Sequence, residues 1–396
     1  MAVERQFLGT KPARPAPWRD PRVRSIAYQA LTLIIVVLVF AFIVDNTLTN
    51  LRRQGIAAGF GFLDRTAGFE IGFSLIPYTA VSTYAEAFLV GLLNTLLVAA
   101  LGIVLATILG FIFGLMRLST NWLVSQLGLV YIETVRNIPL LLQLLFWYFA
   151  VLQALPHPRD SIAIGGVVFL NNRGLSVPLA RLGEGAGATP VALAVALAAI
   201  VLLARWAQRR REATGQPFPT VLVSIGLLLA LPLLAFATLG APVTFEYPEM
   251  GRFRLTGGLT LVPEFVALLA GLSIYTATFI AEIVRAGILA VGHGQIEAAA
   301  ALGLRPKQTL RFVVVPQALR VIIPPLTSQY LNLTKNSSLA VAIGYPDLVS
   351  IANTTLNQTG QAIEAISIFM AVYLLFSLSI SAFMNWYNRR LALKER

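Results

Sequence analysis

Long apolar runs alternate with polar segments along the whole chain. An α-helix needs about 20 apolar residues to cross a bilayer, and runs of this kind occur at 26–44, 87–116, 138–155, 187–204, 220–239, 261–284, 317–340 and 364–385. The pattern therefore predicts an all-α polytopic membrane protein with about eight transmembrane helices. The seventh run is predicted to be a broken helix, because polar or helix-breaking residues interrupt it: Pro324, Pro325, Asn332, Lys335 and Asn336.

Two further segments adjoin these runs. Residues 122–135 mix apolar and polar positions as an amphipathic helix does, and we expect this helix to lie along the membrane surface before the third span. Residues 1–25 are polar and basic. The run that follows is long for a secretory signal peptide and lacks a small-x-small cleavage site. We therefore predict an uncleaved first span.

The composition limits the kinds of functional site that the protein can contain. Hydrophobic residues make up 57% of the chain and charged residues 12%, which is typical of a membrane protein. The absence of cysteine excludes disulfide bonds, thiolate catalysis and cysteine metal sites. The two histidines, His157 and His293, are far apart in sequence, which argues against a histidine metal site or a catalytic triad. We predict neither a metal ion nor a cofactor.

The net charge of +12 is explained by membrane topology. If the N-terminus is cytoplasmic, the inner segments contain 21 of the 30 lysines and arginines, as the positive-inside rule requires. We therefore predict that both termini and the loop 285–320 are cytoplasmic, with anionic membrane lipid as the partner of this charge. No motif for nucleic-acid binding accompanies the basic residues, so nucleic acid is not expected as a partner.

The loop 297–316 carries the clearest local pattern in the second half of the chain. Residues at i, i+3, i+4 and i+7 predict one face of a short helix: Ile296, Ala299, Ala300 and Gly303. Gly303 can end that helix in a left-handed cap, and Pro306 suits the first turn of a second helix. Such an element can dock into a groove of a partner protein. The alternative is an ordinary polar loop.

The same loop resembles a motif of a known family. Glu297-Ala298-Ala299 is followed after three residues by Gly303, and after nine more by Val313-x-Val315-Pro316. This resembles the EAA loop of ABC importer permeases, E-A-A-x3-G-x9-I-x-L-P, with valines in place of Ile and Leu. The resemblance implies a coupling helix that sits in a separate ABC ATPase subunit, with five residues of the motif at the contact: Glu297, Ala298, Ala299, Gly303 and Pro316.

Three further stretches resemble the polar amino-acid permeases, the histidine/glutamine permease subfamily. They are Tyr131–Tyr148, Tyr275–Arg285 and Lys335–Ala340. The resemblance implies a type I ABC importer permease core of five spans, to which helices have been added. The enlarged layout is similar to that of Q-type permease subunits of general L-amino-acid importers.

This resemblance implies a division of the chain and a set of partners. The N-terminus, an extra first span and a periplasmic loop occupy 1–86. The permease core occupies 87–155 and 260–388, with the coupling loop at 291–316. An insertion with an extra pair of spans occupies 156–259, and a cytoplasmic tail occupies 389–396. The implied partners are an ABC ATPase subunit, a second homologous permease subunit and a periplasmic amino-acid-binding protein. The implied location is a bacterial inner membrane, and the implied function is the import of L-amino acids.

Polar residues inside the core spans are candidates for lining the pathway of a zwitterionic substrate. They are Asn94, Asn137, Gln143, Lys335, Ser337 and Ser338. For Asn94 the alternative is a hydrogen bond between helices. For Lys335 the alternative is snorkelling to the outer interface while the serines cap a helix. Asn137 and Gln143 flank Pro139, where freed backbone carbonyls could meet a substrate ammonium group.

Two other patterns predict packing rather than transport. The second span contains glycines that allow helices to approach closely: Gly91, Gly102, Gly110 and Gly114. Two acid–arginine pairs are spaced i, i+3, which predicts bracing ion pairs on helices: Glu133 with Arg136, and Glu282 with Arg285.

Other classes of function lack a supporting motif. The chain has no G-x-x-x-x-G-K-[ST] phosphate loop, so the ATPase must be another polypeptide, and no constellation of residues suggests an enzyme. A proton- or sodium-coupled transporter would require several buried carboxylates and inverted repeats. Here the acids Glu264, Glu282 and Glu364 lie near the ends of spans. A channel subunit is the alternative that topology alone leaves open.

Overall fold

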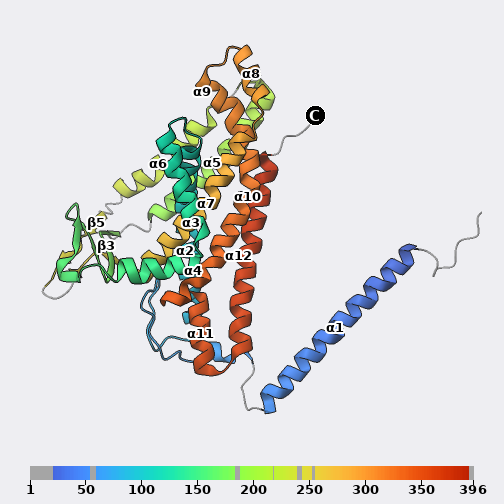
Figure 1. The fold of residues 1–396 in the computed structure, drawn as a ribbon, viewed down its shortest axis with the longest axis vertical. Helices are drawn as coiled ribbons and strands as arrows, with labels where there is room; N and C mark the ends of the chain where they lie inside the picture. The colour runs from blue at the N-terminus through green and yellow to red at the C-terminus, as the bar shows by residue number, and fades with distance from the viewer. Residues whose placement is uncertain are drawn as a thin grey trace, which may run out of the picture.

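The computed structural model of the protein describes residues 21–53, 59–182, 188–216, 218–238, 243–251 and 255–391. Long helices dominate these ranges, and most of them run along the longest axis of the molecule (Figure 1). The helices are α1 (Pro21–Arg53), α2 (Tyr84–Arg117), α3 (Trp122–Asn137), α4 (Leu140–Leu145), α5 (Ala188–Thr214), α6 (Thr220–Thr238), α7 (Pro263–Leu289), α8 (His293–Ala301), α9 (Pro306–Thr309), α10 (Val315–Asn336), α11 (Leu348–Thr359) and α12 (Ala362–Leu391). The predicted basic segment before residue 21 and the last residues of the predicted tail lie outside the described ranges.

Shorter segments of tighter or wider helix join or extend these elements. The segments η2 (Phe60–Asp64), η4 (Pro158–Asp160) and η6 (Ser337–Ile343) are 3-10 helices, and η3 (Phe146–Leu152) and η5 (Leu310–Val314) are π-helices. Because η3 directly follows α4 and η5 directly precedes α10, each π segment continues a helix instead of ending it.

The most extensive helix–helix contact joins α2 and α7. A Cβ atom on Gly110 would lie 2.5 Å from Cβ of Ile280, and one on Gly114 would lie 2.8 Å from the carbonyl oxygen of Ala281. The two backbones therefore approach to a distance that only glycine permits. The prediction that the glycines of this span serve close packing is confirmed. It also holds for Gly91, which faces α11, and for Gly102, which faces Leu333 of α10.

The predicted third span, 138–155, is not a straight transmembrane helix. The helix Leu140–Leu152 meets α3 at 102°, and it is shorter than the roughly 20 residues that a span needs. Pro139 causes the break, because it disfavours helical backbone at the residue before it, and Ile138 is extended there, with φ −93° and ψ 127°.

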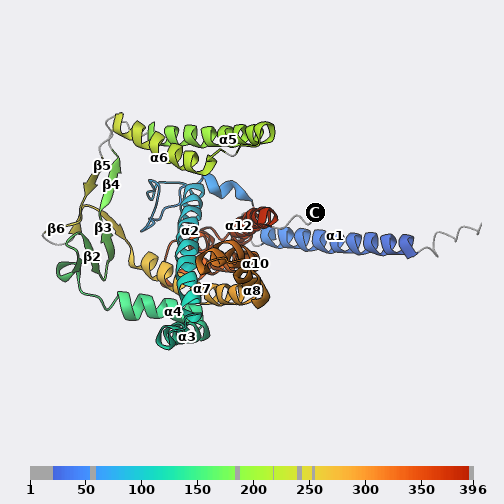
Figure 2. The ribbon, with the colours of Figure 1, turned by 90° about the horizontal axis from the view of Figure 1, so that it is seen from above.

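The helix predicted at 122–135 exists as α3, but its position differs from the expected one. It runs alongside α2 and α7 instead of lying across the end of the bundle (Figures 1 and 2). Gly128 and Ile132 are buried on its inner face, and the Tyr131 ring stacks on Phe113 of α2 with ring centroids 3.8 Å apart. These contacts draw the apolar face of α3 into the bundle.

The multi-span, helical architecture is confirmed, but the number of about eight spans is not. In the described part of the chain, six helices are long and apolar enough to cross a membrane, or seven if the bent pair counts as one span. Helix α6 occupies the predicted span 220–239, yet its apolar segment, Leu222–Ala235, is shorter than the others. The prediction that the seventh span is a broken helix is wrong, because α10 continues through Pro324 and Pro325 and becomes a 3-10 helix only at Ser337.

Short strands, which the sequence analysis did not predict, form a β-arm between η3 and α7. The strands are β1 (Ile162–Ile164), β2 (Val168–Asn171), β3 (Gly174–Val177), β4 (Leu179–Leu182), β5 (Val243–Glu246), β6 (Glu249–Met250), β7 (Leu255–Thr256) and β8 (Leu259–Leu261). An antiparallel sheet has the order β1-β2-β3-β8, with Leu175 opposite Leu261. The pairs β4–β5 and β6–β7 form two smaller sheets. Because β8 ends two residues before Pro263, the β-arm is attached directly to the start of α7.

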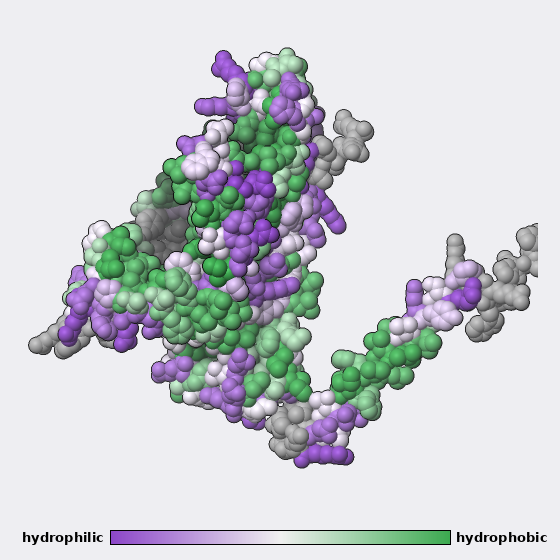
Figure 3. Space-filling model, in the orientation of Figure 1, coloured by the Kyte–Doolittle hydropathy of each residue, from purple (hydrophilic) through white to green (hydrophobic). Residues whose placement is uncertain are grey.

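Two helical elements stand apart from the bundle (Figure 2). In the most apolar 18-residue segment of each helix, no part of α1 and only 11% of α5 is buried. Helices α5 and α6 pack on each other as a hairpin beyond the β-arm. The middle of α1 is hydrophobic and its ends are hydrophilic (Figure 3), as expected for a helix surrounded by lipid.

Replacement of Gly110 by alanine should destabilise the bundle. The added methyl group would meet the β-branched Ile280, whose Cβ cannot rotate away, and such overpacking costs about 1–3 kcal/mol. The midpoint temperature of thermal unfolding, measured on the purified protein in detergent, should be lower for the variant than for the unchanged protein. The matched control is Gly226→Ala on α6, where a Cβ meets nothing within 4 Å. Equal midpoints for the two variants would contradict the packing argument.

Candidate coupling loop and polar sites of the core

The loop that carries the EAA-like motif projects from one end of the bundle, and α11 lies at the other end (Figure 1). Helix α8 ends at Ala301, and Gly303 follows in the left-handed conformation with φ +73°. The amide of Leu304 donates to the carbonyl of Ala299 at 3.1 Å, which is the bond of a Schellman cap. Helix α9 begins with Pro306 at its first position. The predicted pair of short helices with a glycine break is confirmed.

The exposed residues of this loop differ in part from the predicted face. Ala299 is buried against its own chain, whereas Glu297, Ala298 and Ala300 are exposed. Oε1 of Glu297 accepts a hydrogen bond from Nδ1 of His293 one helical turn earlier, at 3.0 Å. Large apolar side chains are exposed beside these residues: Leu302 by 81%, Leu310 by 55% and Phe312 by 61%. Exposed apolar side chains that gather at a projecting end are typical of surfaces that bind another protein.

The loop is continuous with one long helix of the core. From Pro306, the chain passes through α9, η5 and α10 to Ile343 as one 38-residue helical stretch, and Pro316 lies in the first turn of α10. The outward face of α10 carries the polar residues Ser328, Asn332 and Lys335, all exposed. Their spacing of four and three residues places them in one line along the helix. We call these three residues the α10 polar stripe.

Gln143 holds the bend between α3 and α4. Its Nε2 donates to the carbonyls of Val135 at 2.7 Å and Ile138 at 2.8 Å, which the break at Pro139 leaves without helical partners. Asn137 is exposed and donates to the carbonyl of Glu133 at 2.6 Å. The carbonyls freed by the bend are therefore bonded by a side chain of the same protein.

Asn94 joins three segments in the core and has no exposed surface. Its Nδ2 donates to the carbonyls of Phe73 and Pro346, each at 2.9 Å. The hydroxyl of Tyr345 donates to the backbone carbonyl of Asn94 at 3.3 Å. Of the two interpretations that the sequence allowed, this geometry is that of the hydrogen bond between segments.

The buried carboxylate of Asp347, one residue after the Pro346 carbonyl that Asn94 bonds, was not among the predicted site residues. Asp347 is fully buried and caps α11, because its Oδ1 accepts from the amide of Ser350 at 2.8 Å. The adjacent amide of Leu348 donates to Thr95 of α2 at 3.1 Å. Burial raises the pKa of the Asp347 carboxyl above its usual range. An Asp three residues before a Ser at the start of an apolar helix was the available signal.

The remaining pathway candidates lie at the end of α10. Ser337 is buried and donates to the carbonyl of Thr334 at 2.7 Å, and Ser338 donates to the carbonyl of Lys335 at 2.7 Å. Both serines thus bond the turn that precedes them. Lys335 and Ser338 line one edge of a groove of about 510 Å³, whose other wall is formed by Phe369, Met370 and Tyr373. In the described part of the chain, Lys335 forms no ion pair.

One of the two predicted ion pairs exists, and the other prediction is wrong. Glu282 binds Arg285, with Oε2 2.9 Å from Nη2, and also lies 3.9 Å from Nε of Arg117 of α2. In contrast, Arg136 does not pair with Glu133. Its guanidinium lies over the Phe279 ring of α7 at 5.2 Å, while Glu133 bonds Asn137. The packing of α3 against α7 turns Arg136 toward the aromatic ring.

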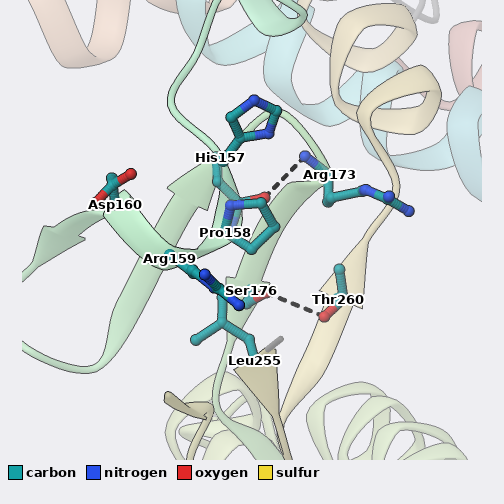
Figure 4. Close-up of a pocket in the computed structure, with 9 residues that line it drawn as sticks. His157, Pro158, Arg159, Asp160, Arg173, Ser176, Leu255 and Thr260 are labelled. Carbon is teal, nitrogen blue, oxygen red and sulfur yellow. Dashed lines mark hydrogen bonds between the residues drawn. The ribbon is translucent and has the colours of Figure 1, made fainter. Parts of the chain in front are cut away.

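A second hollow, of about 700 Å³, lies on the β-arm (Figure 4). Polar side chains surround it, among them His157, Asp160 and Arg173. The hydroxyls of Ser176 and Thr260 meet across β3 and β8 at 3.0 Å. None of these was predicted as a site residue, because the pairing of β3 with β8 brings together positions 84 residues apart.

Comparison with known proteins agrees with this arrangement. Residues 102–393 match the family described as "Binding-protein-dependent transport system inner membrane component". The chain is 56% identical over 377 residues to the general L-amino acid transport system permease protein AapQ of Rhizobium johnstonii, with 95% of this chain and 94% of that protein covered. It is 53% identical over 378 residues to the putative amino-acid ABC transporter permease protein YhdX of Escherichia coli, covering 95% of this chain and 96% of that protein.

A solved structure described as an amino acid ABC transporter with histidines is also similar, with a TM-score of 0.46 and 22% identity over 78% of this chain and 95% of that chain. The family match covers most of the described bundle, including the projecting loop and α10. The two relatives extend the likeness over nearly the whole sequence. The chain therefore belongs to the family of inner membrane components of binding-protein-dependent transport systems.

Proposed function

We propose that this chain is a permease subunit of an ATP-driven importer of L-amino acids. It forms the translocation pathway together with a second, homologous permease subunit. The support for the substrate class is that both relatives are described as permease proteins of amino-acid transport systems, the second as a putative one. A permease moves its solute unchanged, so the protein is not an enzyme.

The projecting loop is the observation that carries this proposal. Helix α8, the left-handed turn at Gly303 and α9 form a compact element outside the bundle. Leu302 at its turn, and Leu310 and Phe312 in the adjoining η5, are exposed on the described surface. An ATPase subunit with a matching groove would bury these side chains in the helix-in-groove manner. Glu297, Ala298, Ala299, Gly303 and Pro316 then belong to the coupling element.

Motion of the loop would pass directly to α10. Because α9, η5 and α10 form one helical stretch, a displacement of the docked loop moves the helix that bears the α10 polar stripe. Helix α10 contacts α2 at two points. Leu333 packs on Gly102, and the hydroxyls of Tyr330 and Thr107 lie 3.0 Å apart. A change in the ATPase can in this way reach the middle of the bundle.

The α10 polar stripe is the part of the subunit best suited to face the substrate pathway. Polar and charged groups in a transmembrane helix are costly when they face lipid. Ser328, Asn332 and Lys335 are exposed on the described surface, so a second permease subunit or a water-filled pathway should cover them. Lys335 can interact there with a substrate carboxylate. Asn137 is also exposed, whereas Asn94, Gln143 and Ser337 are occupied with backbone carbonyls.

The proposed orientation of the protein in the membrane follows from the distribution of its arginines and lysines. The loop 285–320 and the two termini would face the cytoplasm, where ATP is, in the inner membrane of a bacterium. The opposite end, with α11 and the segment before α2 (Figure 1), would then meet a periplasmic amino-acid-binding protein.

Replacement of Gly303 by aspartate should uncouple transport from ATP hydrolysis. A side chain at φ +73° costs about 1–2 kcal/mol in the left-handed conformation, and the carboxylate would enter the docking surface. We expect ATP-driven amino-acid uptake into proteoliposomes to fall by about tenfold or more, which corresponds to 1.4 kcal/mol.

The matched control for this variant is Gly215→Asp. Gly215 has φ +71° and open space around it, but it lies in the α5–α6 connection, away from α8. Uptake should persist in the control. Normal uptake by Gly303→Asp, with the ATPase subunit still bound, would contradict the coupling role of the loop.

Replacement of Lys335 by alanine tests the pathway. A charge-assisted hydrogen bond to a carboxylate contributes about 1.5–3 kcal/mol, so uptake should fall by about tenfold to a hundredfold, while association with the ATPase is unchanged. Lys335→Arg retains the charge and should retain most of the uptake. Unaltered uptake kinetics in Lys335→Ala would instead support a lysine that snorkels to the interface.

A further inference from the structure

The apolar outer faces of the α5–α6 hairpin are not covered by the described part of the chain. Its two helices pack on each other, and they stand away from the bundle (Figure 2). Large apolar side chains on the outer faces of both helices are exposed: Val191, Val195, Val201, Leu202, Leu222, Ile225, Leu229 and Leu233. In a membrane protein such faces lie against lipid tails.

Four arginines occur within about two turns at the end of α5. Arg205, Arg209, Arg210 and Arg211 are all exposed. None of the four forms an ion pair within the described ranges. The neighbouring acid, Glu212, is hydrogen-bonded to Gln208 at 3.1 Å. Because one acid stands beside four arginines, the described tip keeps an excess of positive charge.

Two aromatic rings mark the depth of these arginines in a membrane. Trp206 and Phe218 meet edge to face, with ring centroids 5.2 Å apart. The Arg210 guanidinium lies 5.4 Å from the centre of the Trp206 ring and 5.9 Å from that of Phe218. Tryptophan is enriched where lipid tails meet headgroups, so in a membrane the guanidinium groups beside it would lie near the level of the phosphates.

A hollow between the two helices at the same tip has room for a headgroup. It measures about 640 Å³ and is lined by Arg211, Gln208 and Glu212 on the polar side, with Ala207 and Phe218 among its apolar walls. The tip lies at the same end of the molecule as α8 and α9 (Figure 1) and is separated from them sideways (Figure 2). Its lipid would belong to the leaflet on the coupling-loop side.

We propose that the tip of the α5–α6 hairpin binds the headgroup of an anionic phospholipid in the leaflet on the coupling-loop side. Guanidinium groups bind phosphate oxygens through paired hydrogen bonds, and Arg210 is already positioned by the two rings. The apolar flanks of the hairpin favour a lipid over a free phosphate, because only a lipid covers both the flanks and the tip. The site thereby anchors the hairpin in the membrane plane beside the permease core.

The test uses the full-length protein in detergent and two fluorescent lipids with identical acyl chains, phosphatidylglycerol and phosphatidylcholine. We expect tighter binding of phosphatidylglycerol. The combined variant R209Q/R210Q/R211Q should weaken that binding by about tenfold or more and leave phosphatidylcholine binding unchanged. The variant R209K/R210K/R211K keeps the charge and should retain most of the affinity.

Two controls make the outcome decisive. The variant R159Q/R173Q removes two exposed arginines of the β-arm and should not change phosphatidylglycerol binding. Inorganic phosphate should not displace the lipid at millimolar concentration. Undiminished phosphatidylglycerol binding in the triple glutamine variant would overturn the proposal, and so would equal loss in the β-arm variant or displacement by inorganic phosphate. The measurement needs neither ATP nor substrate, so its result is independent of the transport proposal.

Discussion

The close approach of α2 to α7 is the contact on which the rest of the bundle depends. Gly110 and Gly114 let the backbone of α2 reach Ile280 and Ala281 of α7, because no side chain of α2 stands at these two positions. Contacts of this kind stabilise membrane helices, because lipid tails remove most of the hydrophobic advantage of association. Helix α10 joins the pair through further glycines, with Gly102 of α2 against Leu333 and Gly287 of α7 against Ile322. Three helices thus form one tightly packed unit, to which α3, α11 and α12 are added.

The polar side chains of this unit serve two different purposes. Gln143 and Asn94 bond backbone carbonyls that helix breaks or loops leave without partners, which is required where no water is available. The α10 polar stripe has no such role among the described residues, and it lies on the outer surface of the same unit. The contrast separates groups that maintain the fold from groups that are available to a substrate or a second subunit. Polarity alone did not distinguish these two groups of residues in the sequence.

Local patterns predicted their structures well. The left-handed turn at Gly303, the start of α9 at Pro306 and the bond between Glu282 and Arg285 all depend on residues within one or two helical turns. The wrong ion pair, Glu133 with Arg136, has the same i, i+3 spacing as the correct one. The difference is that Phe279 of a distant helix offers Arg136 an aromatic surface. Spacing cannot report a partner that is more than a hundred residues away.

The sequence by itself determined the membrane class, the positions of most helices and the projecting loop, because apolar runs, glycine and proline act through the backbone nearby. Only the tertiary structure showed which of these runs form helices long enough to cross a membrane. A bend of 102° at Pro139 and the contacts that draw α3 into the bundle removed one predicted straight span. It also decided that Asn94 bonds loop carbonyls and that Asp347 is buried beside Thr95. The physical reason is that burial and hydrogen-bond partners are set by segments that meet only after folding, as the β3–β8 pairing shows.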